Sequence, residues 1–349
     1  MAGKQFFSSN NLGADLCVTQ HRTHIGKLKF KRVRSACDLK KYDQIIYWGD
    51  FQNNPMWGGR DFARREIGNS DLNTVEEAFE YWKEFYLELG KQLPESTKIY
   101  SFGNCFLGMN QKLEDPGTKK SFEYFLQRTD GIVVRDTGSY QLIKSLFSEL
   151  SQRVYQGYDV SSLLQTNTRP SKNKEPYFVW SFGRSDISAD EAQRLVQNIE
   201  SKLGIKAINI DWLKPELLFG LRHFFHGAFK KILNTIANSS FVLTDIYHMT
   251  LNCYNLRTPV IGIYKESRDT VQFGTLNDEK KKMLFEMVDG ADFIFRIHGD
   301  EITAAETESI CKCAKNILER PDFPARLFQA HKNRTNELEN LILELMGFK

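Results

Sequence analysis

Three places in the sequence put ionisable side chains where chemistry on a small anion could take place. They hold Arg135 with Asp136, Arg184 alone, and Asp245 with His248. A histidine titrates near neutral pH and can move protons, and a guanidinium group offers paired hydrogen-bond donors at fixed positive charge. Brought together, such side chains could bind a molecule with phosphate and carboxylate groups and protonate it.

The three places share one local design, in which an apolar run is followed by a short polar loop and the start of a helical pattern. In an open parallel sheet the carboxyl ends of the strands meet at one edge, where helix N-termini add free main-chain amides. We therefore expect Arg135, Arg184 and His248 to converge on one cleft that receives a polyanion.

Each of these residues also has a structural interpretation, which the residues alone leave open. Arg135 and Asp136 could form a helix cap with a surface ion pair. Arg184 could belong to a solvated loop. His248 could be a structural histidine in the first turn of its helix.

The rest of the sequence alternates between strand and helix patterns. Apolar runs rich in β-branched and aromatic residues occur at 44–49, 98–103, 131–134, 177–182, 205–210, 240–244, 259–263 and 292–297. Helical patterns occur at 74–93, 138–150, 189–204 and 248–256, and two amphipathic helices are expected at 303–319 and 324–346. Ser188 with Glu191 matches the capping box that starts a helix. Because several runs are continuously apolar, the pattern predicts an α/β protein with parallel sheets.

The length of 349 residues exceeds what one hydrophobic core usually fills, so two domains are expected. The polar stretch 165–176, which two prolines interrupt, suits a linker. It separates an N-terminal domain at 1–164 from a C-terminal domain at 177–320, and a C-terminal helix follows at 321–349.

Composition and charge argue against several classes of protein. A net charge of +3 gives no sign of nucleic-acid binding, and the basic run 27–34 alternates with apolar residues, which predicts an edge strand. Six cysteines without metal or disulfide spacing fit a reducing compartment. No apolar stretch has the length of a signal peptide or a membrane span. We expect a cytoplasmic protein without an integral membrane segment, and peripheral association with a membrane stays open.

Two segments resemble elements of the polysaccharide pyruvyltransferase family: IVVRDTGS at 132–139 and FVLTDIYHMTLNCYNLRTPVIGIYKESR at 241–268. The first is similar to the family's strand, Arg-Asp and Ser element. The second is similar to its strand, Asp-Arg-x-His, helix and Pro-Val-Ile element. Shorter likenesses lie at 10–16, 42–51, 157–164 and 177–185.

The resemblance implies a fold and a reaction. It implies two Rossmann-like domains in a GT-B-like arrangement, with the N-terminal domain on the acceptor side, the C-terminal domain on the donor side and a cleft between them. It implies transfer of pyruvate from phosphoenolpyruvate to two hydroxyls of a sugar, which leaves a cyclic ketal and phosphate. Neither a metal nor a cofactor beyond the donor is expected, and the saccharide acceptor could be lipid-linked.

The resemblance also assigns roles to residues. His248 would be the general acid and base, Asp245 would orient its imidazole or cap its helix, and Asp136 would fix Arg135. The expected substrate-binding residues are Arg135, Asp136, Arg184, Arg268, Asn11, Gly13 and Asp50.

The chain departs from the family pattern at three positions, with Ile246 in place of Arg, Ala14 in place of Asp and Arg268 in place of Lys. Arg268 or Arg257 is left to supply the missing charge beside His248.

Two other functions stay open. One is a nucleotide-sugar-dependent GT-B glycosyltransferase, which the same architecture would serve. The other is a non-catalytic relative that binds a glycan or an anion.

Overall fold

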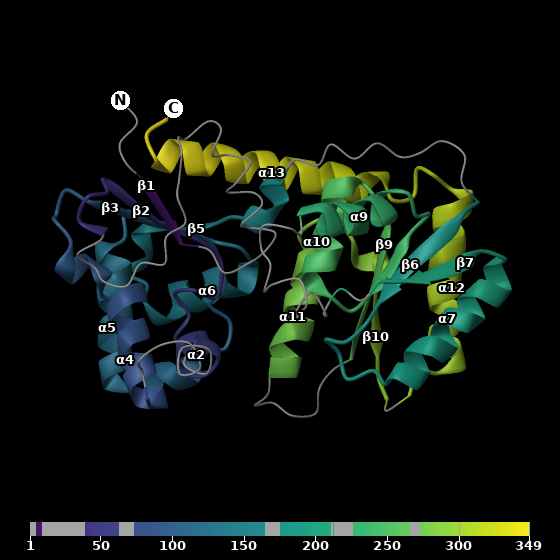
Figure 1. Ribbon diagram of the computed structural model, residues 1–349, viewed down its shortest axis with the longest axis horizontal. Coiled ribbons are helices and arrows are strands. Elements are labelled where there is room, and N and C mark those ends of the chain that lie inside the picture. Colours follow the sequence, from purple (N-terminus) through teal and green to yellow (C-terminus); the bar gives the residue numbers. More distant parts are fainter. Residues whose placement is uncertain are drawn as a thin grey trace. The chain divides into compact units, whose positions relative to one another are not determined.

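The computed structural model describes residues 5–8, 39–62, 73–164, 175–210, 212, 226–265, 273–299 and 301–348 (Figure 1). The chain divides into two compact units, Met1–Leu164 with Thr335–Lys349, and Gln165–Arg334. Each unit contains a five-stranded sheet in which all strand pairs are parallel. The prediction of an α/β protein with two Rossmann-like parallel sheets is confirmed.

The first unit has the strand order β1-β2-β3-β4-β5. Its strands are β1 (Gln5–Ser8), β2 (Gln44–Asp50), β3 (Lys98–Asn104), β4 (Gly131–Val134) and β5 (Val154–Gln156). Its helices are α2 (Pro55–Trp57), α4 (Val75–Tyr86), α5 (Pro116–Arg128) and α6 (Thr137–Leu146). All four residues of β4 are buried, as its continuously apolar sequence indicates.

The second unit has the strand order β10-β9-β8-β6-β7. Its strands are β6 (Tyr177–Ser181), β7 (Lys206–Asn209), β8 (Val242–Thr244), β9 (Val260–Lys265) and β10 (Ile294–Ile297). Its helices are α7 (Ala189–Leu203), α9 (His226–Ala237), α10 (Tyr247–Leu256), α11 (Phe273–Glu286) and α12 (Ala304–Glu319). Figure 1 shows the strands of this sheet between α10 and α11 on one side and α7 and α12 on the other, so helices cover both faces.

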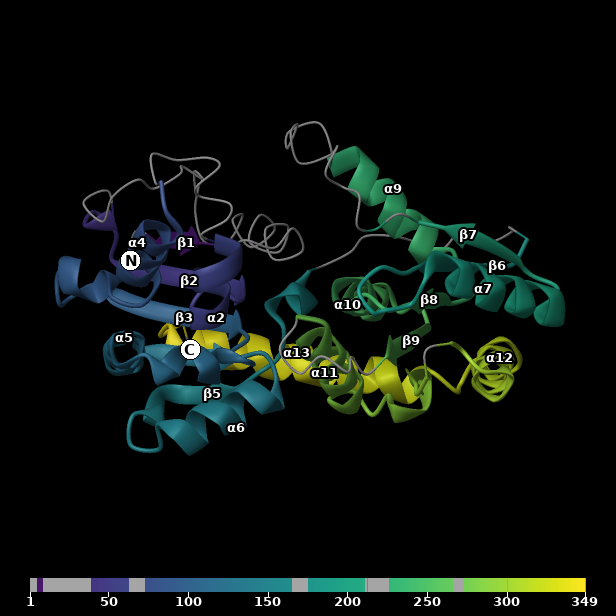
Figure 2. The same cartoon turned by 90° about the horizontal axis from the view of Figure 1, so that it is seen from below.

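The last helix, α13 (Ala325–Leu345), is continuous in both ribbon views (Figure 1, Figure 2). Its first half packs in the second unit, where the His331 ring lies 5.5 Å from the Tyr254 ring. Its second half packs in the first unit. There the Leu345 side chain lies so close to Gly131 that a Cβ atom added to this glycine would be 3.2 Å from it. The two compact units therefore share this helix.

Every predicted strand among the described residues is present, and the capping box of Ser188 and Glu191 starts α7 as expected. The helix predicted at 74–93 is shorter, because α4 ends at Tyr86 and a 3₁₀ turn follows at Leu89–Gln92. The edge strand expected at 27–34 and most of the linker, 165–174, lie outside the described residues.

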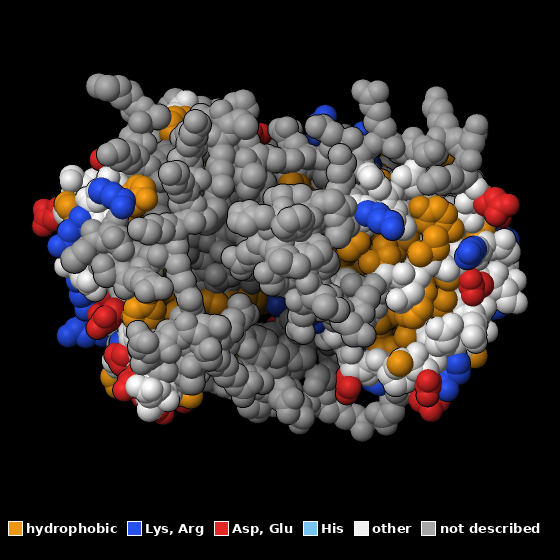
Figure 3. All heavy atoms as spheres, in the orientation of Figure 1, with side chains coloured by type: hydrophobic (Ala, Val, Ile, Leu, Met, Phe, Trp, Pro, Cys, Tyr) orange, Lys and Arg blue, Asp and Glu red, His pale blue; other side chains and the backbone are white. Residues whose placement is uncertain are grey.

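Acidic and basic side chains are interspersed over the described surface in Figure 3, as the small net charge indicates. Hydrophobic side chains also reach this surface (Figure 3). Among the helices of the described residues, none has the length and apolar character needed to cross a bilayer.

Candidate active site at the strand ends

The sheet of the second unit reverses its strand order at β6. This strand pairs with β7 on one side and with β8 on the other, and β9 and β10 continue outward from β8. In doubly wound sheets, ligands bind outside the carboxyl ends of the strands at such a reversal. Arg184 follows β6, and Asp245 and His248 follow β8. The fold therefore brings these three predicted residues to the position where such sheets bind ligands.

Asp245 is fully buried, and its carboxylate holds the loop after β6. Oδ2 accepts the main-chain N–H of Arg184 at 2.7 Å and that of Ser185 at 2.5 Å. The N–H of Gly183 lies 3.0 Å from Oδ1 and 3.1 Å from Oδ2. Gly183 has a φ of 138°, which a residue with a side chain rarely adopts, and this helps the three N–H groups face one carboxylate.

This geometry corrects two expectations for Asp245. The residue that caps α10 is Ile246, which has no side chain able to accept a hydrogen bond, so Asp245 does not cap this helix. Within the described residues, its carboxylate is hydrogen-bonded to the loop rather than to the imidazole of His248. The physical reason is charge, because three amides pointing together attract an anion and Asp245 is the anion that the chain supplies. The Asp245 carboxylate therefore holds the loop after β6.

Arg184 has an exposed side chain on a backbone that is held in place. Within the described part of the chain, its guanidinium group makes no ion pair. The side chain of the neighbouring Ser185 is also hydrogen-bonded. Lys281 of α11 donates from Nζ to Ser185 Oγ at 2.5 Å. The sequence analysis did not single out Lys281, since nothing local to 273–286 indicates a partner 96 residues earlier.

His248 lies in the first turn of α10 and is half-buried. Its ring packs edge-on against Tyr247, with the ring centroids 5.2 Å apart, and its main-chain carbonyl accepts from Asn252 Nδ2 at 2.7 Å. The expectation that Arg257 could supply a charge beside this histidine is wrong. Arg257 caps the opposite end of this helix, about 14 Å further along the axis than His248.

In the first unit, the Arg135 side chain is buried at 1 % exposure between two carboxylates. Its Nη1 lies 3.4 Å from Asp159 Oδ2, and its Nε lies 3.8 Å from Asp136 Oδ2. The guanidinium carbon lies 5.1 Å from the centre of the Phe51 ring. The prediction that Asp136 fixes Arg135 is consistent with this geometry, whereas a surface ion pair is wrong because the pair is buried.

Asp136 is also the cap of α6, since its Oδ1 accepts the N–H of Ser139 at 2.7 Å. Asp159 lies in the short likeness at 157–164, but no role was predicted for it. Asp159 accepts the N–H of Ser161 at 2.8 Å with one oxygen and faces Arg135 with the other. An acidic residue after β5, at the same sheet edge as Arg135, was the available signal.

The polar stretch that follows β2 is part of this buried edge. Gln52, Asn53 and Asn54 have no exposed surface. Asn54 donates from Nδ2 to the carbonyls of Cys105 and Leu107, at 3.0 and 2.9 Å, which ties this loop to the one after β3. These three residues are therefore buried and do not form a surface loop.

Several predicted site residues cannot be placed in the same detail. Asn11, Gly13 and Arg268 lie outside the described residues. Asp50 is the last residue of β2, where its backbone lies in register with Asn104 of β3, and its side chain is not described. Arg135 and Asp136 belong to the first unit, and Arg184, Asp245 and His248 to the second. The expected convergence of all of them on one cleft stays a prediction.

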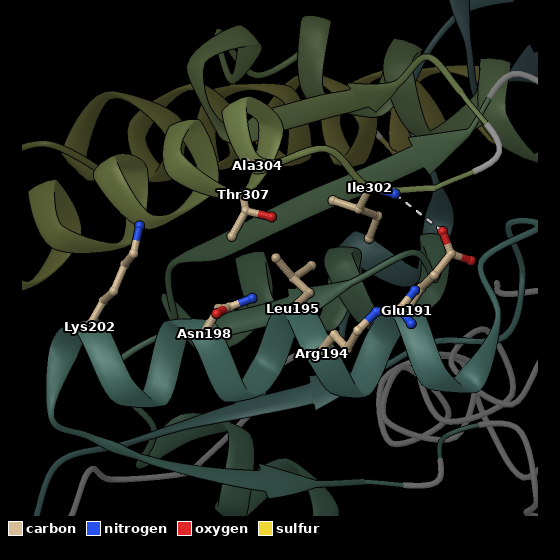
Figure 4. Close-up of a pocket in the computed structure, with 8 residues that line it drawn as sticks. All are labelled: Glu191, Arg194, Leu195, Asn198, Lys202, Ile302, Ala304 and Thr307. Atoms are coloured by element: carbon tan, nitrogen blue, oxygen red, sulfur yellow. Dashed lines mark hydrogen bonds between the residues drawn. The ribbon is translucent and has the colours of Figure 1, made fainter.

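A groove of about 320 Å³ lies between α7 and α12 in the second unit (Figure 4). Leu195 and Ile302 line its interior, and Arg194 and Lys202 lie at its rim. None of the predicted site residues lines it. At one end the Glu191 carboxylate accepts the N–H of Ile302 at 3.2 Å. Burial opposes the charged form of Glu191, but hydrogen bonds from Ser188, the charge of Lys265 and the Ile302 amide hold its pKa below the usual value.

A doubly wound parallel sheet with an arginine and a histidine at its strand reversal defines a Rossmann-like α/β protein with a candidate ligand site. The chain matches the family described as polysaccharide pyruvyl transferase over residues 22–267. It belongs to this family, and the resemblance inferred from the sequence is confirmed.

No curated protein matches the chain. Among solved structures, similar ones include a functionally uncharacterised protein from Klebsiella pneumoniae, with 13% identity, coverage of 85% of this chain and 94% of that chain, and a TM-score of 0.43. A putative UDP-N-acetylglucosamine 2-epimerase from Listeria monocytogenes has 11% identity, 92% and 83% coverage and a TM-score of 0.49. The UDP-GlcNAc 2-epimerase from Neisseria meningitidis, bound to UDP-GlcNAc, has 10% identity, 99% and 91% coverage and a TM-score of 0.48. At these values the likenesses carry no conclusion about activity.

Proposed function

We propose that the protein transfers pyruvate from phosphoenolpyruvate to two hydroxyls of a sugar in a glycan or a glycan precursor, forming a cyclic ketal. Family membership supports a transferase that acts on polysaccharide. The observation that carries the finer proposal is the position of His248, which lies within the matched region and in the first helical turn beside the strand reversal.

The reaction needs a proton donor, a proton acceptor and positive charge. The methylene carbon of the donor takes up a proton, the two sugar oxygens form bonds to the central carbon, and the bond to phosphate breaks. The two hydroxyl protons balance the one on the new methyl group and the one on the released phosphate. In this proposal His248 gives and takes the protons, because an imidazole group can act as both acid and base near neutral pH. Arg184 binds the anionic groups of the donor with its exposed guanidinium group.

Burial limits what Arg135 can contribute to donor binding. A guanidinium group held at 1 % exposure by Asp159 and Asp136 reaches a ligand only if that contact opens. Arg268, Asn11, Gly13 and Asp50 keep their proposed binding roles from the family resemblance. The proposed reaction uses no cofactor beyond the donor. We place it in the cytoplasm, where the cysteines would stay reduced.

The loop after β6 gives one reason to prefer this donor over a nucleotide sugar at the same site. The diphosphate of a nucleotide sugar would accept hydrogen bonds from the main-chain N–H groups of such a loop. Here the Asp245 carboxylate already accepts hydrogen bonds from the N–H groups of Gly183, Arg184 and Ser185. A donor held through side chains fits this arrangement better.

The test is to incubate the protein with phosphoenolpyruvate and a library of saccharides, and to follow phosphate release and the masses of the sugars. We expect phosphate release that depends on both substrates, with a pyruvylated sugar as the product. Thermal shift with a panel of nucleotide sugars is the parallel measurement. Sugar transfer from a nucleotide sugar would identify a glycosyltransferase, and ligand binding without any turnover would identify a non-catalytic relative.

A further inference from the structure

Lys281 of α11 is a buried lysine that the proposed reaction does not use. Its exposed fraction is 2 %, whereas the next residue on the helix, Lys282, has a side chain that is 54% exposed and pairs with Glu286. A lysine ammonium is costly to bury unless hydrogen bonds and opposite charge compensate for lost hydration. The Lys281 ammonium group therefore needs hydrogen-bond acceptors within the protein.

The ammonium group of Lys281 lies next to the loop that carries Arg184. Its Nζ donates to Ser185 Oγ at 2.5 Å, and the main-chain N–H of the same serine donates to Asp245 Oδ2 at 2.5 Å. Ser185 thus links a buried cation on α11 to a buried anion after β8. The loop after β6 is held on two sides, by Asp245 through its backbone and by Lys281 through a side chain.

We infer that Lys281 is a positioning residue, which holds Ser185 so that the neighbouring Arg184 is presented to the donor's anionic group. This inference rests on the proposed function, because donor binding by Arg184 is part of that proposal. A side chain attached to an ordered backbone loses less conformational freedom when a ligand binds, so the held loop should raise affinity for the donor. Lys281 itself is too buried to touch the donor.

The experiment compares Lys281→Met with the wild-type protein and with Lys282→Met, an exposed lysine on the same helix. Hydrogen exchange followed by mass spectrometry reports on the amides of residues 183–185, independently of any activity. Steady-state kinetics reports kcat and the KM for phosphoenolpyruvate. Lys281→Arg tests rescue by another cation, and Ser185→Ala removes the acceptor while keeping the amide that binds Asp245.

In Lys281→Met we expect exchange at residues 183–185 to be faster by about tenfold, because the loop opens more easily. The KM for phosphoenolpyruvate should rise by about three- to tenfold with little change in kcat. Ser185→Ala should show the same faster exchange and the same higher KM. Lys281→Arg should show smaller changes in both quantities than Lys281→Met. Lys282→Met should have the exchange rates and the KM of the wild-type protein.

Unchanged exchange at 183–185 in both Lys281→Met and Ser185→Ala would overturn the inference. Faster exchange with an unchanged KM would also overturn it, because the loop would then be held for a reason other than the donor. If the wild-type protein turns over no phosphoenolpyruvate with any saccharide, the proposed function fails. The exchange data would then decide alone whether Lys281 holds this loop. If Lys281→Met does not fold, Ser185→Ala decides the same question.

Discussion

The carboxylate of Asp245 accepts the main-chain N–H of Arg184 at 2.7 Å, from a position 61 residues later in the chain. This contact joins the ends of the two strands between which the sheet order reverses. Converging amides at such a position would otherwise attract an external anion. The chain supplies its own anion there, and leaves the Arg184 side chain exposed.

Replacing Asp245 with Asn should destabilise the protein. A neutral amide forms weaker hydrogen bonds to the three N–H groups than a carboxylate does, and a buried donor group is added beside them. We expect a loss of about 2 to 4 kcal/mol in the free energy of unfolding, measured by urea denaturation. The exposed Asp186 in the same loop provides the control, and Asp186→Asn should be nearly neutral. Equal effects of the two changes would contradict this role for Asp245.

Replacing Asp245 with Ala should create an anion site. Without the carboxylate, the amides of 183–185 are left without their acceptor. Inorganic phosphate should then raise the melting temperature of Asp245→Ala more than that of the wild-type protein. The same phosphate dependence in both proteins would show that Asp245 does not fill an anion site.

Arg135 and Asp159 should be energetically coupled, because both are buried and 3.4 Å apart. Removing the Arg135 charge leaves the carboxylate of Asp159 buried without this cation, so Arg135→Met should cost about 3 to 5 kcal/mol. Asp159→Asn should cost less, because Asp136 still lies 3.8 Å from Arg135. The double variant should cost less than the sum of the single ones, as a double-mutant cycle of unfolding free energies would show. Strictly additive losses would argue against the pair. Weaker donor binding in Arg135→Met with full stability would mean that Arg135 contacts the donor instead.

Stability should fall in mild acid because of His331. Burial lowers the pKa of this histidine from 6.5 to about 4, and its Nε2 lies 3.0 Å from Asn255 Oδ1. As the pH falls from 6.5 towards 4, the unfolded chain binds a proton here that the folded chain does not. The stabilisation is therefore present above pH 6.5 and is lost on acidification, by at most about 1.4 kcal/mol per pH unit. Unfolding free energies of His331→Gln across this range should lack that part of the slope, and an identical slope would contradict the assignment.

Features that depend on neighbouring residues could be predicted from the sequence. The apolar run before Asp136 predicted β4, and the side-chain oxygen of Asp136 or Thr137 predicted a cap for α6, which is Asp136. The capping box of Ser188 and Glu191 is likewise local. The short strands β1 and β5, of four and three residues, were not predicted, since such runs are too short for a periodic pattern.

Features that depend on distant contacts could not be predicted in the same way. The sequence placed Asp245 correctly at the end of a strand, but its partner could have been the next helix or a neighbouring loop, and only strand pairing decides between them. Arg135 likewise pairs with Asp159, which lies after another strand, β5. Lys281 gave no local signal, because a lysine in an amphipathic helix is usually exposed.

A pair of histidine variants decides whether His248 transfers protons in a pyruvyl transfer reaction. His298, an exposed histidine that follows β10 in the same sheet, is the matched control. With an acceptor sugar identified from the saccharide library, His248→Ala should lower turnover of phosphoenolpyruvate by about a hundredfold or more. Donor binding, measured by calorimetry, should be kept, and His298→Ala should leave turnover unchanged. Turnover in His248→Ala equal to that of the wild-type protein would exclude His248 from proton transfer.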